Sequence, residues 1–532
     1  MGDTGQLNPR KRRLEDSTAE PFPSTGVFIR RPTQQTRGLV WYTSERGLRR
    51  CRWDSAVSDD EIRRMFERDI GFQPDEVTSL AAGYYNRAYT VPWNEDGKTE
   101  LRVIRVSLPN EPKWKILSER ATMEWVDRNT ELPVPHVYKT YHDPDRTADR
   151  TGAPSCETWD DCEPKMDLAH TSGIVREIAA FLATTFQKQL RGIGNIYSDP
   201  SKVPSASIIP AEWDLSSPKN NIVQRMVSAN FIPKSLCQLD YPRGPFKSSN
   251  EYMRARLAFA EQDLKARLYL AREWMKARAD ELHDDEVLEA ESQEWDNKRY
   301  TTEETMRGEL GRRRHHTTNS ADSDDESDED TSDSGGFEYD VDEICLLKNA
   351  LSNMAKLRDL LDVVFPPPHP DDEPEASTIY HPDMHGENII VNTTHGKLGG
   401  VLDWEWVSAV PLWEACVWPK FLRKDDDENS WHNEPDKDYY WTAVLDKDGK
   451  VTEKFCESDF ALHMRLYRRT RLREVFRETM QALSPEWVKV TTWSEPLILY
   501  SNMLTNYDDP KRLREFDYGY DKLAKMRKTA KT

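Results

Sequence analysis

The stretch that decides the fold spans residues 379–391 and reads Ile379-Tyr380-His381-Pro382-Asp383-Met384-His385-Gly386-Glu387-Asn388-Ile389-Ile390-Val391. Apolar residues at its two ends indicate strands, and the polar residues between them indicate a loop. Within this loop Asp383 follows His381 by two residues, and Asn388 follows Asp383 by five. The spacing predicts one short loop that presents a carboxylate and an amide oxygen close together.

A hairpin follows this loop and ends in a second carboxylate. Residues 389–392 and 398–402 are predicted strands, and residues 393–397 form the turn between them. A hairpin returns the chain to the end from which it started. We therefore expect Asp403 to lie beside Asn388.

These residues form the set that phosphoryl transfer requires. The reaction needs a carboxylate that accepts or orients the acceptor hydroxyl, and it needs oxygen ligands for Mg²⁺. We predict that Asp383 has the first role, with His381 beside it, and that Asn388 and Asp403 bind the metal. Taken alone, Asp383 is also typical of a turn carboxylate that caps a backbone amide, and Asn388 is also typical of the end of a loop. The joint pattern has the spacing of a kinase catalytic loop and favours catalysis.

With these residues the sequence resembles the family of aminoglycoside phosphotransferases and choline kinases, and it is most similar to the large fungal branch. The resemblance covers roughly residues 70–140, 173–245 and 345–470. Its motifs are residues 381–391, Gly400-Val401-Leu402-Asp403-Trp404-Glu405 and, for the fungal branch, Pro411-Leu412-Trp413-Glu414-Ala415 and Ile193-Gly194-Asn195-Ile196-Tyr197.

The resemblance implies a protein-kinase-like, two-lobed fold of the α+β class, with a small antiparallel-sheet N-lobe and a mostly helical C-lobe. It also implies an enzyme that uses ATP and Mg²⁺ to transfer a phosphoryl group to the hydroxyl of a small-molecule alcohol. Members of the family act on aminoglycosides, choline and other alcohols, so the substrate is left open.

The resemblance further assigns four residues to nucleotide binding. Gly83 and Asn86 stand in the phosphate-covering loop, although a glycine here is also typical of a plain hairpin turn. Arg105 stands where kinases use a strand lysine, and arginine keeps the charge while it changes the geometry of the phosphate contact. Glu119 on the next helix is the expected partner of Arg105, with Glu124 as the alternative. A solvated helix face is the alternative role of both glutamates.

Local patterns predict the other elements. Alternating apolar residues and an Asp-Gly turn indicate strands in the region that follows a short capped helix. Apolar residues at helical spacing indicate helices elsewhere. The expected strands are residues 77–80, 88–93 and 101–107, and the expected helices are residues 58–66, 113–128, 172–190, 249–313, 341–361 and 459–483.

The family pattern breaks after residue 138. Residues 142–154 are polar where the family has a hinge strand, and no apolar run occurs before Leu168. We therefore expect a missing or degenerate hinge in residues 141–172. The chain is then either a catalytically impaired, kinase-like binding protein or an incomplete gene model of an active enzyme. A protein kinase is the weaker alternative, because residues 404–406 and 411–414 replace the activation segment.

Amino-acid composition distinguishes the other segments of the chain. We expect a disordered basic tail over residues 1–40, an N-lobe over 41–140 and the first part of the C-lobe over 173–248. A charged helical insertion is expected over 249–314, an acidic disordered linker over 315–340, and the rest of the C-lobe, with the catalytic loop and C-terminal helices, over 341–532.

Charge and composition restrict the partners. The formal net charge is -20, which argues against nucleic acid as a partner. No apolar run reaches the roughly 20 residues of a membrane helix, and seven cysteines do not suggest a disulfide framework. We expect a cytoplasmic protein, with nuclear import as the alternative suggested by the basic residues 10–13. The acidic linker is either a site for a protein partner or a passive spacer.

Deletion of residues 315–336 tests the expected disorder of the acidic linker. This tract of Ser, Asp, Glu and Thr cannot bury a core, so its removal should leave the thermal melting temperature unchanged. Differential scanning calorimetry of the full chain and of the deletion variant gives the comparison. A large drop in melting temperature would show that the tract contributes to the folded core.

Overall fold

The computed structural model describes most of the chain between residues 39 and 529. The described residues are 39–43, 49–53, 57–71, 73–83, 86–95, 98–108, 114–143, 146–152, 157–197, 222–232, 241–282, 341–423, 430–445, 451–509 and 512–529. Residues 1–38 of the expected tail, residues 283–314 of the expected helical insertion and the whole of the expected acidic linker lie outside them.

An antiparallel sheet forms the first half of the fold. Its order is β3-β4-β5-β7-β6, and β4 pairs with β5 along its whole length, from Asn86 opposite Ser107 to Glu95 opposite Lys98. The three strands predicted here are confirmed. The strand bounds are β3 (Thr78–Ala82), β4 (Asn86–Glu95), β5 (Lys98–Ser107), β6 (Val137–Asp143) and β7 (Arg146–Gly152).

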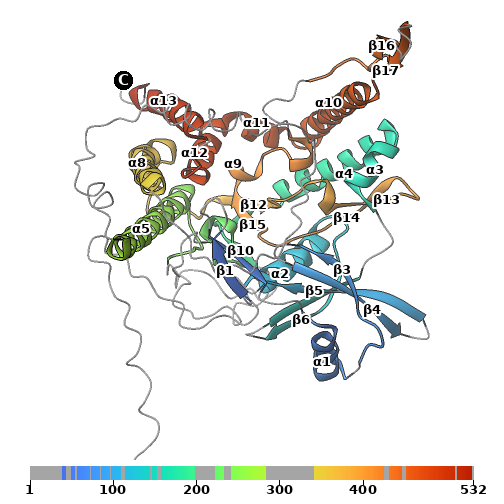
Figure 1. The fold of residues 1–532 in the computed structure, drawn as a ribbon, viewed down its shortest axis with the longest axis horizontal. Coiled ribbons are helices and arrows are strands. Elements are labelled where there is room, and N and C mark those ends of the chain that lie inside the picture. Colours follow the sequence, from blue (N-terminus) through green and yellow to red (C-terminus); the bar gives the residue numbers. More distant parts are fainter. Residues whose placement is uncertain are drawn as a thin grey trace, which may run out of the picture.

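The helix α1 (Asp59–Ile70) lies on one face of this sheet (Figure 1). Ser58 caps its first turn and exchanges hydrogen bonds with Glu61, so the capped helix start is confirmed. Its buried side chains Ile62 and Phe66 pack in one cluster with residues of the sheet such as Val91. The helix thereby covers apolar surface of β4 and β5.

The strand β7 corrects a prediction. The sequence predicted no strand in the polar stretch after residue 141, yet residues 146–152 pair with β5 on one side and with β6 on the other. The hydrogen bonds of a sheet join backbone groups, so a polar sequence forms a strand when both neighbours are in place. Of residues 141–172, over which a missing or degenerate hinge was expected, residues 144–145 and 153–156 lie outside the described residues.

Short sheets surround the predicted catalytic hairpin. β13 (Ile389–Asn392) pairs with β14 (Lys397–Val401) and with β8 (Glu157–Thr158), which precedes the short helix α3 (Trp159–Cys162). β12 (Ala376–Tyr380) pairs with two further strands. The remaining strands are β1 (Leu39–Thr43), β2 (Arg49–Trp53), β9 (Leu190–Arg191), β10 (Asn195–Tyr197), β11 (Ile222–Gln224), β15 (Ser408–Pro411), β16 (Trp441–Leu445) and β17 (Val451–Phe455).

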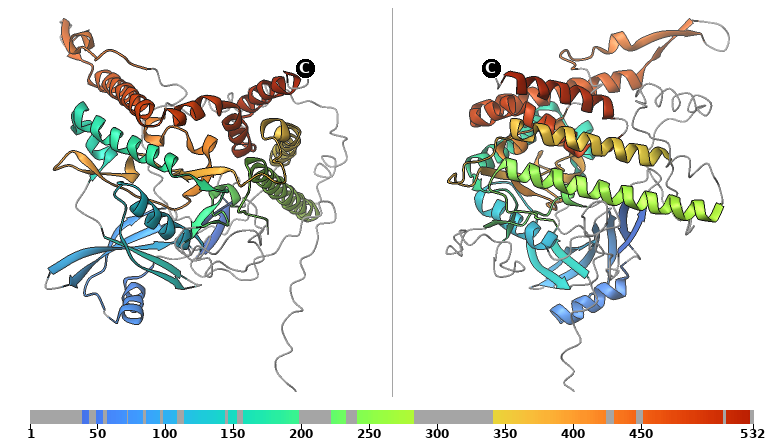
Figure 2. Two further views of the ribbon diagram at one scale, coloured as in Figure 1. Left: turned by 180° about the vertical axis from the view of Figure 1, so that it is seen from behind. Right: turned by 90° about the vertical axis from the view of Figure 1, so that its left-hand side faces the viewer.

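Helices make up much of the rest of the fold. The helix α1 and the helix of residues 114–129 lie next to the large sheet, whereas the helices of residues 457–529 lie on the opposite side of the molecule from it (Figure 1). The long helices α5 and α8 run side by side, as Figure 2 shows. All the predicted helices exist, although the structure describes the 249–313 segment only as far as residue 282. The helix bounds are α2 (Trp114–Asn129), α4 (Leu168–Gln187), α5 (Ser249–Leu282), α8 (Val341–Val364), α9 (Leu412–Ala415), α10 (Glu457–Leu483), α11 (Pro485–Trp493), α12 (Glu495–Thr505) and α13 (Leu513–Thr529).

Two apolar cores support these helices. One lies between α5, α8, α12 and α13, with Leu264 and Tyr500 fully buried in it. The other joins α2, α4 and α10 to the catalytic hairpin, and it contains Trp404. None of the helices in the described part of the chain is long and apolar enough to cross a membrane.

Asn195 connects the helix α2 to the second core. Its side-chain amide donates to the Ser118 hydroxyl of α2 at 2.7 Å and to the Val407 carbonyl at 2.9 Å. Its amide oxygen accepts from the Val227 amide at 2.8 Å and from the Ser408 hydroxyl at 3.0 Å. The residue is 1% exposed, so no water replaces these partners when they are lost.

Replacing Asn195 by alanine should destabilise the fold by at least about 2 kcal/mol, because several buried polar groups lose their partner. Urea denaturation measures the change in the free energy of unfolding. Asn502→Ala is the matched control, since Asn502 is exposed on α12, and it should change stability by less than about 0.5 kcal/mol. Equal effects of the two substitutions would contradict the role assigned to Asn195.

Candidate active site

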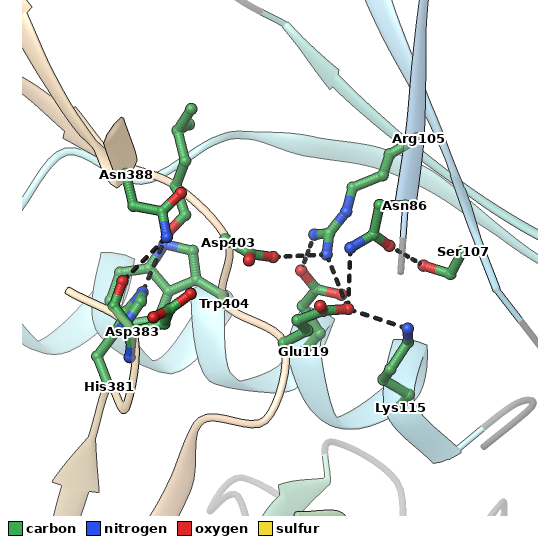
Figure 3. A network of polar contacts seen from close by, with 12 residues as sticks. Asn86, Arg105, Ser107, Lys115, Glu119, His381, Asp383, Asn388, Asp403 and Trp404 are labelled. Carbon is green, nitrogen blue, oxygen red and sulfur yellow. Dashed lines mark hydrogen bonds and ion pairs between the residues drawn. The ribbon is translucent and has the colours of Figure 1, made fainter. Parts of the chain in front are cut away.

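Asp383 and Asn388 are held together by hydrogen bonds inside the loop between β12 and β13. The Asn388 side-chain amide donates to the Asp383 carbonyl at 2.9 Å, and the Asn388 backbone amide donates to the His385 carbonyl at 3.1 Å. The His385 amide in turn donates to the Asp383 carbonyl at 2.9 Å. The two predicted residues therefore lie in one tightly turned loop, as Figure 3 shows.

His381 lies beneath this loop and is only 6% exposed. Its Nδ1 accepts a hydrogen bond from the Asp383 amide at 3.2 Å, so its Nε2–H donates to the Leu402 carbonyl at 3.0 Å. Burial lowers the pKa of His381 to about 4, so the ring is neutral at physiological pH. The imidazole thus ties the loop of Asp383 to the strand end that precedes Asp403.

Asp403 follows the hairpin and has a left-handed backbone, with a φ of 57°. The Leu402 amide donates to the Asn388 carbonyl at 2.8 Å, which places the end of the hairpin against the loop that carries Asp383 and Asn388. The next residue, Trp404, is 1% exposed and donates from its indole nitrogen to the Val401 carbonyl at 2.7 Å. The backbone turns sharply at Asp403, in a conformation that aspartate tolerates better than most residues.

Arg105 of β5 faces Asp403 from the large sheet. Its guanidinium donates to Asp403 Oδ1 at 2.9 Å and forms an ion pair with Glu119 of α2. The expected pair of Arg105 and Glu119 is present in the structure. Burial and the nearby Glu405 raise the pKa of Asp403 to about 6, and the charge of Arg105 opposes this rise.

Glu405 is a buried carboxylate to which sequence reasoning gave no role. A single oxygen, Oε2, accepts from Asn86 at 2.9 Å and lies 2.9 Å from Lys115 Nζ and 3.3 Å from the Arg105 guanidinium. Burial raises the pKa of Glu405, but Lys115 and Arg105 more than offset this, so the group is ionised. One signal could have indicated Lys115: it precedes Glu119 by one helical turn and so shares a face of α2.

Gly83 and Asn86 close the turn between β3 and β4. The Gly83 amide donates to the Asn86 carbonyl at 2.8 Å. The Asn86 side chain donates to Glu405 Oε2 at 2.9 Å. It also accepts a hydrogen bond at 2.7 Å from the hydroxyl of Ser107, which lies beside it in Figure 3. The Gly83 amide and the Asn86 side chain thus both form hydrogen bonds within the protein. Residues 84–85 of the turn lie outside the described residues.

Asp383 has a cationic neighbour that the sequence did not indicate. Lys420 Nζ lies 2.6 Å from Asp383 Oδ1, and His385 Nε2 lies 3.4 Å from Asp383 Oδ2. Partial burial raises the pKa of Asp383, but the hydrogen bond and the charge of Lys420 lower it below its ordinary value. The carboxylate is therefore ionised at neutral pH and can accept a proton or a hydrogen bond.

The residues present fit a hard divalent cation. Within the described ranges, no group of three or more His, Cys, Asp or Glu side chains is arranged to hold a metal. The predicted ligands are instead one carboxylate and one amide, and Mg²⁺ often takes only one or two protein ligands beside phosphate and water. In the described part of the chain, neither Asp403 Oδ2 nor the Asn388 amide oxygen has a hydrogen-bond partner. Both oxygens can therefore serve as ligands.

Comparison with known proteins gives remote similarities only. No protein-family model matches the sequence, and no curated protein matches it. Among solved structures, the ADP-bound aminoglycoside phosphotransferase APH(2'')-Ib is similar with a TM-score of 0.31 and 10% identity, over 88% of this chain and 99% of that chain. The gentamicin complex of APH(2'')-IIa has a TM-score of 0.31 and 11% identity, over 88% of this chain and 97% of that one. The PknI kinase domain of Mycobacterium tuberculosis has a TM-score of 0.18 and 12% identity, over 24% of this chain and 57% of that domain.

Proposed function

We propose that this protein is an ATP-dependent phosphotransferase that acts on the hydroxyl of a small-molecule alcohol. The observation that carries the proposal is the arrangement of Asp383, Asn388 and Asp403 around one loop and hairpin, with Arg105 facing them (Figure 3). The motifs of residues 381–391 and 400–405 further support a place among enzymes of the aminoglycoside phosphotransferase and choline kinase type.

Asp383 is the proposed acceptor of the substrate proton. It is ionised and 39% exposed, so an alcohol can reach its carboxylate. The alcohol oxygen forms a bond to the γ-phosphorus of ATP, and its proton passes to Asp383. The bond between the γ-phosphorus and the bridging oxygen breaks, and ADP leaves with the electron pair. Neutral His381 keeps the loop in position and exchanges no proton.

Asn388 and Asp403 would hold Mg²⁺ through their free oxygens. The ion, when bound, neutralises charge on the phosphates of ATP. Arg105 can contact those phosphates through its guanidinium, which its ion pair with Glu119 keeps near Asp403. Glu405 and Lys115 keep Arg105 and α2 at fixed positions around the site.

A second candidate function is that of a kinase-like binding protein without catalysis. The observation in its favour is the ion pair of Arg105 with Asp403 at 2.9 Å, which places a fixed positive charge on the expected metal ligand. A nucleotide with Mg²⁺ must compete with that contact. Titration of ATP into the protein, with Mg²⁺ and with EDTA, separates the candidates, because the enzyme requires metal-dependent binding and the binding protein does not.

Asp383→Asn should abolish phosphotransfer and leave the binding of Mg²⁺-ATP largely intact, whereas Asp403→Asn should weaken that binding as well. Asp383 acts on the acceptor, and its loss costs about 10²–10⁴-fold in rate. Asp403 contributes a full negative charge to a hard cation that also contacts the phosphates. Isothermal titration calorimetry measures the binding, and ADP production measures the rate.

Asp371→Asn is the control for these substitutions, because Asp371 is an exposed carboxylate in the loop before β12. It should change neither quantity. Equal loss of nucleotide binding in Asp383→Asn and Asp403→Asn would contradict the division of roles. Absence of metal-dependent ATP binding by the unmodified protein would exclude the enzyme and leave the binding protein.

A further inference from the structure

Lys420 reaches the catalytic loop from a segment far along the chain. It begins the 3-10 turn Lys420–Leu422, and its Nζ contacts the carboxylate of Asp383 at 2.6 Å across 37 residues of sequence. No lysine or arginine occurs within the loop of residues 381–388. The positive charge next to Asp383 therefore comes from outside the loop.

The backbone around Lys420 is fixed to the catalytic loop. The Phe421 amide donates to the carbonyl of Met384, the residue after Asp383, at 3.1 Å. The Phe421 ring packs edge-on against Trp159, with 5.4 Å between ring centroids. Arg473 of α10 donates to the Leu422 carbonyl at 2.8 Å. The backbone at Lys420 is thus held next to the catalytic loop, which keeps its side chain within reach of Asp383.

The Lys420 ammonium has donors to spare. A lysine ammonium carries three N–H donors, and Asp383 is the hydrogen-bond partner of Lys420 in the described part of the chain. The side chains of Lys420 and Asp383 are 44% and 39% exposed, so a ligand can reach both. Arg105, by contrast, contacts the three carboxylates of Glu119, Asp403 and Glu405.

The other groups near Asp383 do not supply a fixed positive charge. His381 is buried and neutral. His385 Nε2 lies 3.1 Å from the Asn388 side-chain amide, so the ring accepts that hydrogen bond when it is neutral. Asp403 is an acid and repels the Asp383 carboxylate. Among the side chains that contact the Asp383 carboxylate in the described chain, Lys420 is therefore the one that belongs to a lysine or arginine.

We propose that Lys420 is a catalytic residue, which binds the transferring phosphoryl group while it orients Asp383. The proposal rests on the proposed phosphotransferase function. The alcohol oxygen that Asp383 orients must be next to the phosphorus it attacks, so the phosphoryl oxygens come within reach of the remaining donors of Lys420. These N–H groups are already in place before the reaction, so they can stabilise the negative charge on the phosphoryl oxygens during the transfer. Lys420 acts only by binding the phosphoryl group and transfers no proton.

The complex of the protein with Mg²⁺, ADP and aluminium fluoride tests this role, because aluminium fluoride stands in for the transferring phosphoryl group. Lys420→Met should bind Mg²⁺-ADP as the unmodified protein does, but should bind ADP with aluminium fluoride about 10²-fold more weakly. Lys420→Arg keeps the charge and should recover most of that affinity. Lys397→Met is the matched control, an exposed lysine on β14 that should behave like the unmodified protein in both titrations.

The titrations test the role of Lys420 separately from the proposed phosphotransferase function. Equal affinity of the unmodified protein and of Lys420→Met for ADP with aluminium fluoride overturns the role of Lys420 and leaves the phosphotransferase function standing. Equal weakening of both ADP complexes in Lys420→Met also overturns it, because the lysine then supports the nucleotide site in general. Absence of any Mg²⁺-ADP binding by the unmodified protein overturns the phosphotransferase function and this inference together.

Discussion

The rest of the site depends on the ionised and buried carboxylate of Glu405. A charge that is only 4% exposed is tolerated in a folded protein when opposite charges and donors surround it. Here the partners come from three elements, Asn86 on β4, Arg105 on β5 and Lys115 on α2. All three elements must therefore be in place before the chain can bury Glu405, and the residue beside it, Asp403, is positioned by the same requirement.

This constraint determines the position of α2 relative to the catalytic hairpin. Lys115 contacts Glu405 from the first turn of the helix, and Ser118 receives a hydrogen bond from Asn195 less than one turn later. Glu119 holds Arg105 from the same stretch. Two ion pairs and one hydrogen bond thus join this stretch of the helix to the sheet and to the second core. These contacts hold the helix in the position from which Glu119 pairs with Arg105.

Local patterns in the sequence predicted much of the fold. The loop of residues 381–388 and the hairpin that follows it were predicted from motifs and short spacings, and the pair of Arg105 and Glu119 was expected from the resemblance to the phosphotransferase family. The strand β7 was not predicted, because its stability comes from backbone hydrogen bonds to β5 and β6 and its polar side chains carry no periodic signal. The contact of Lys420 with Asp383 could not be predicted either, because it depends on how the chain returns after the hairpin.

Trp406 has a left-handed backbone, with a φ of 64°, although an aromatic residue disfavours that conformation. The cost is of order 1–3 kcal/mol, and glycine would avoid it. The indole ring lies 5.4 Å from the ammonium of Lys115, so glycine at this position would remove a neighbour of a buried charge. The chain is locally frustrated here, with the backbone and the side chain favouring different residues. Selection for thermostability alone would favour glycine at position 406. That substitution would also remove the ring beside Lys115, the partner of Glu405. At this turn, a higher thermal stability and a rigid site therefore require different residues.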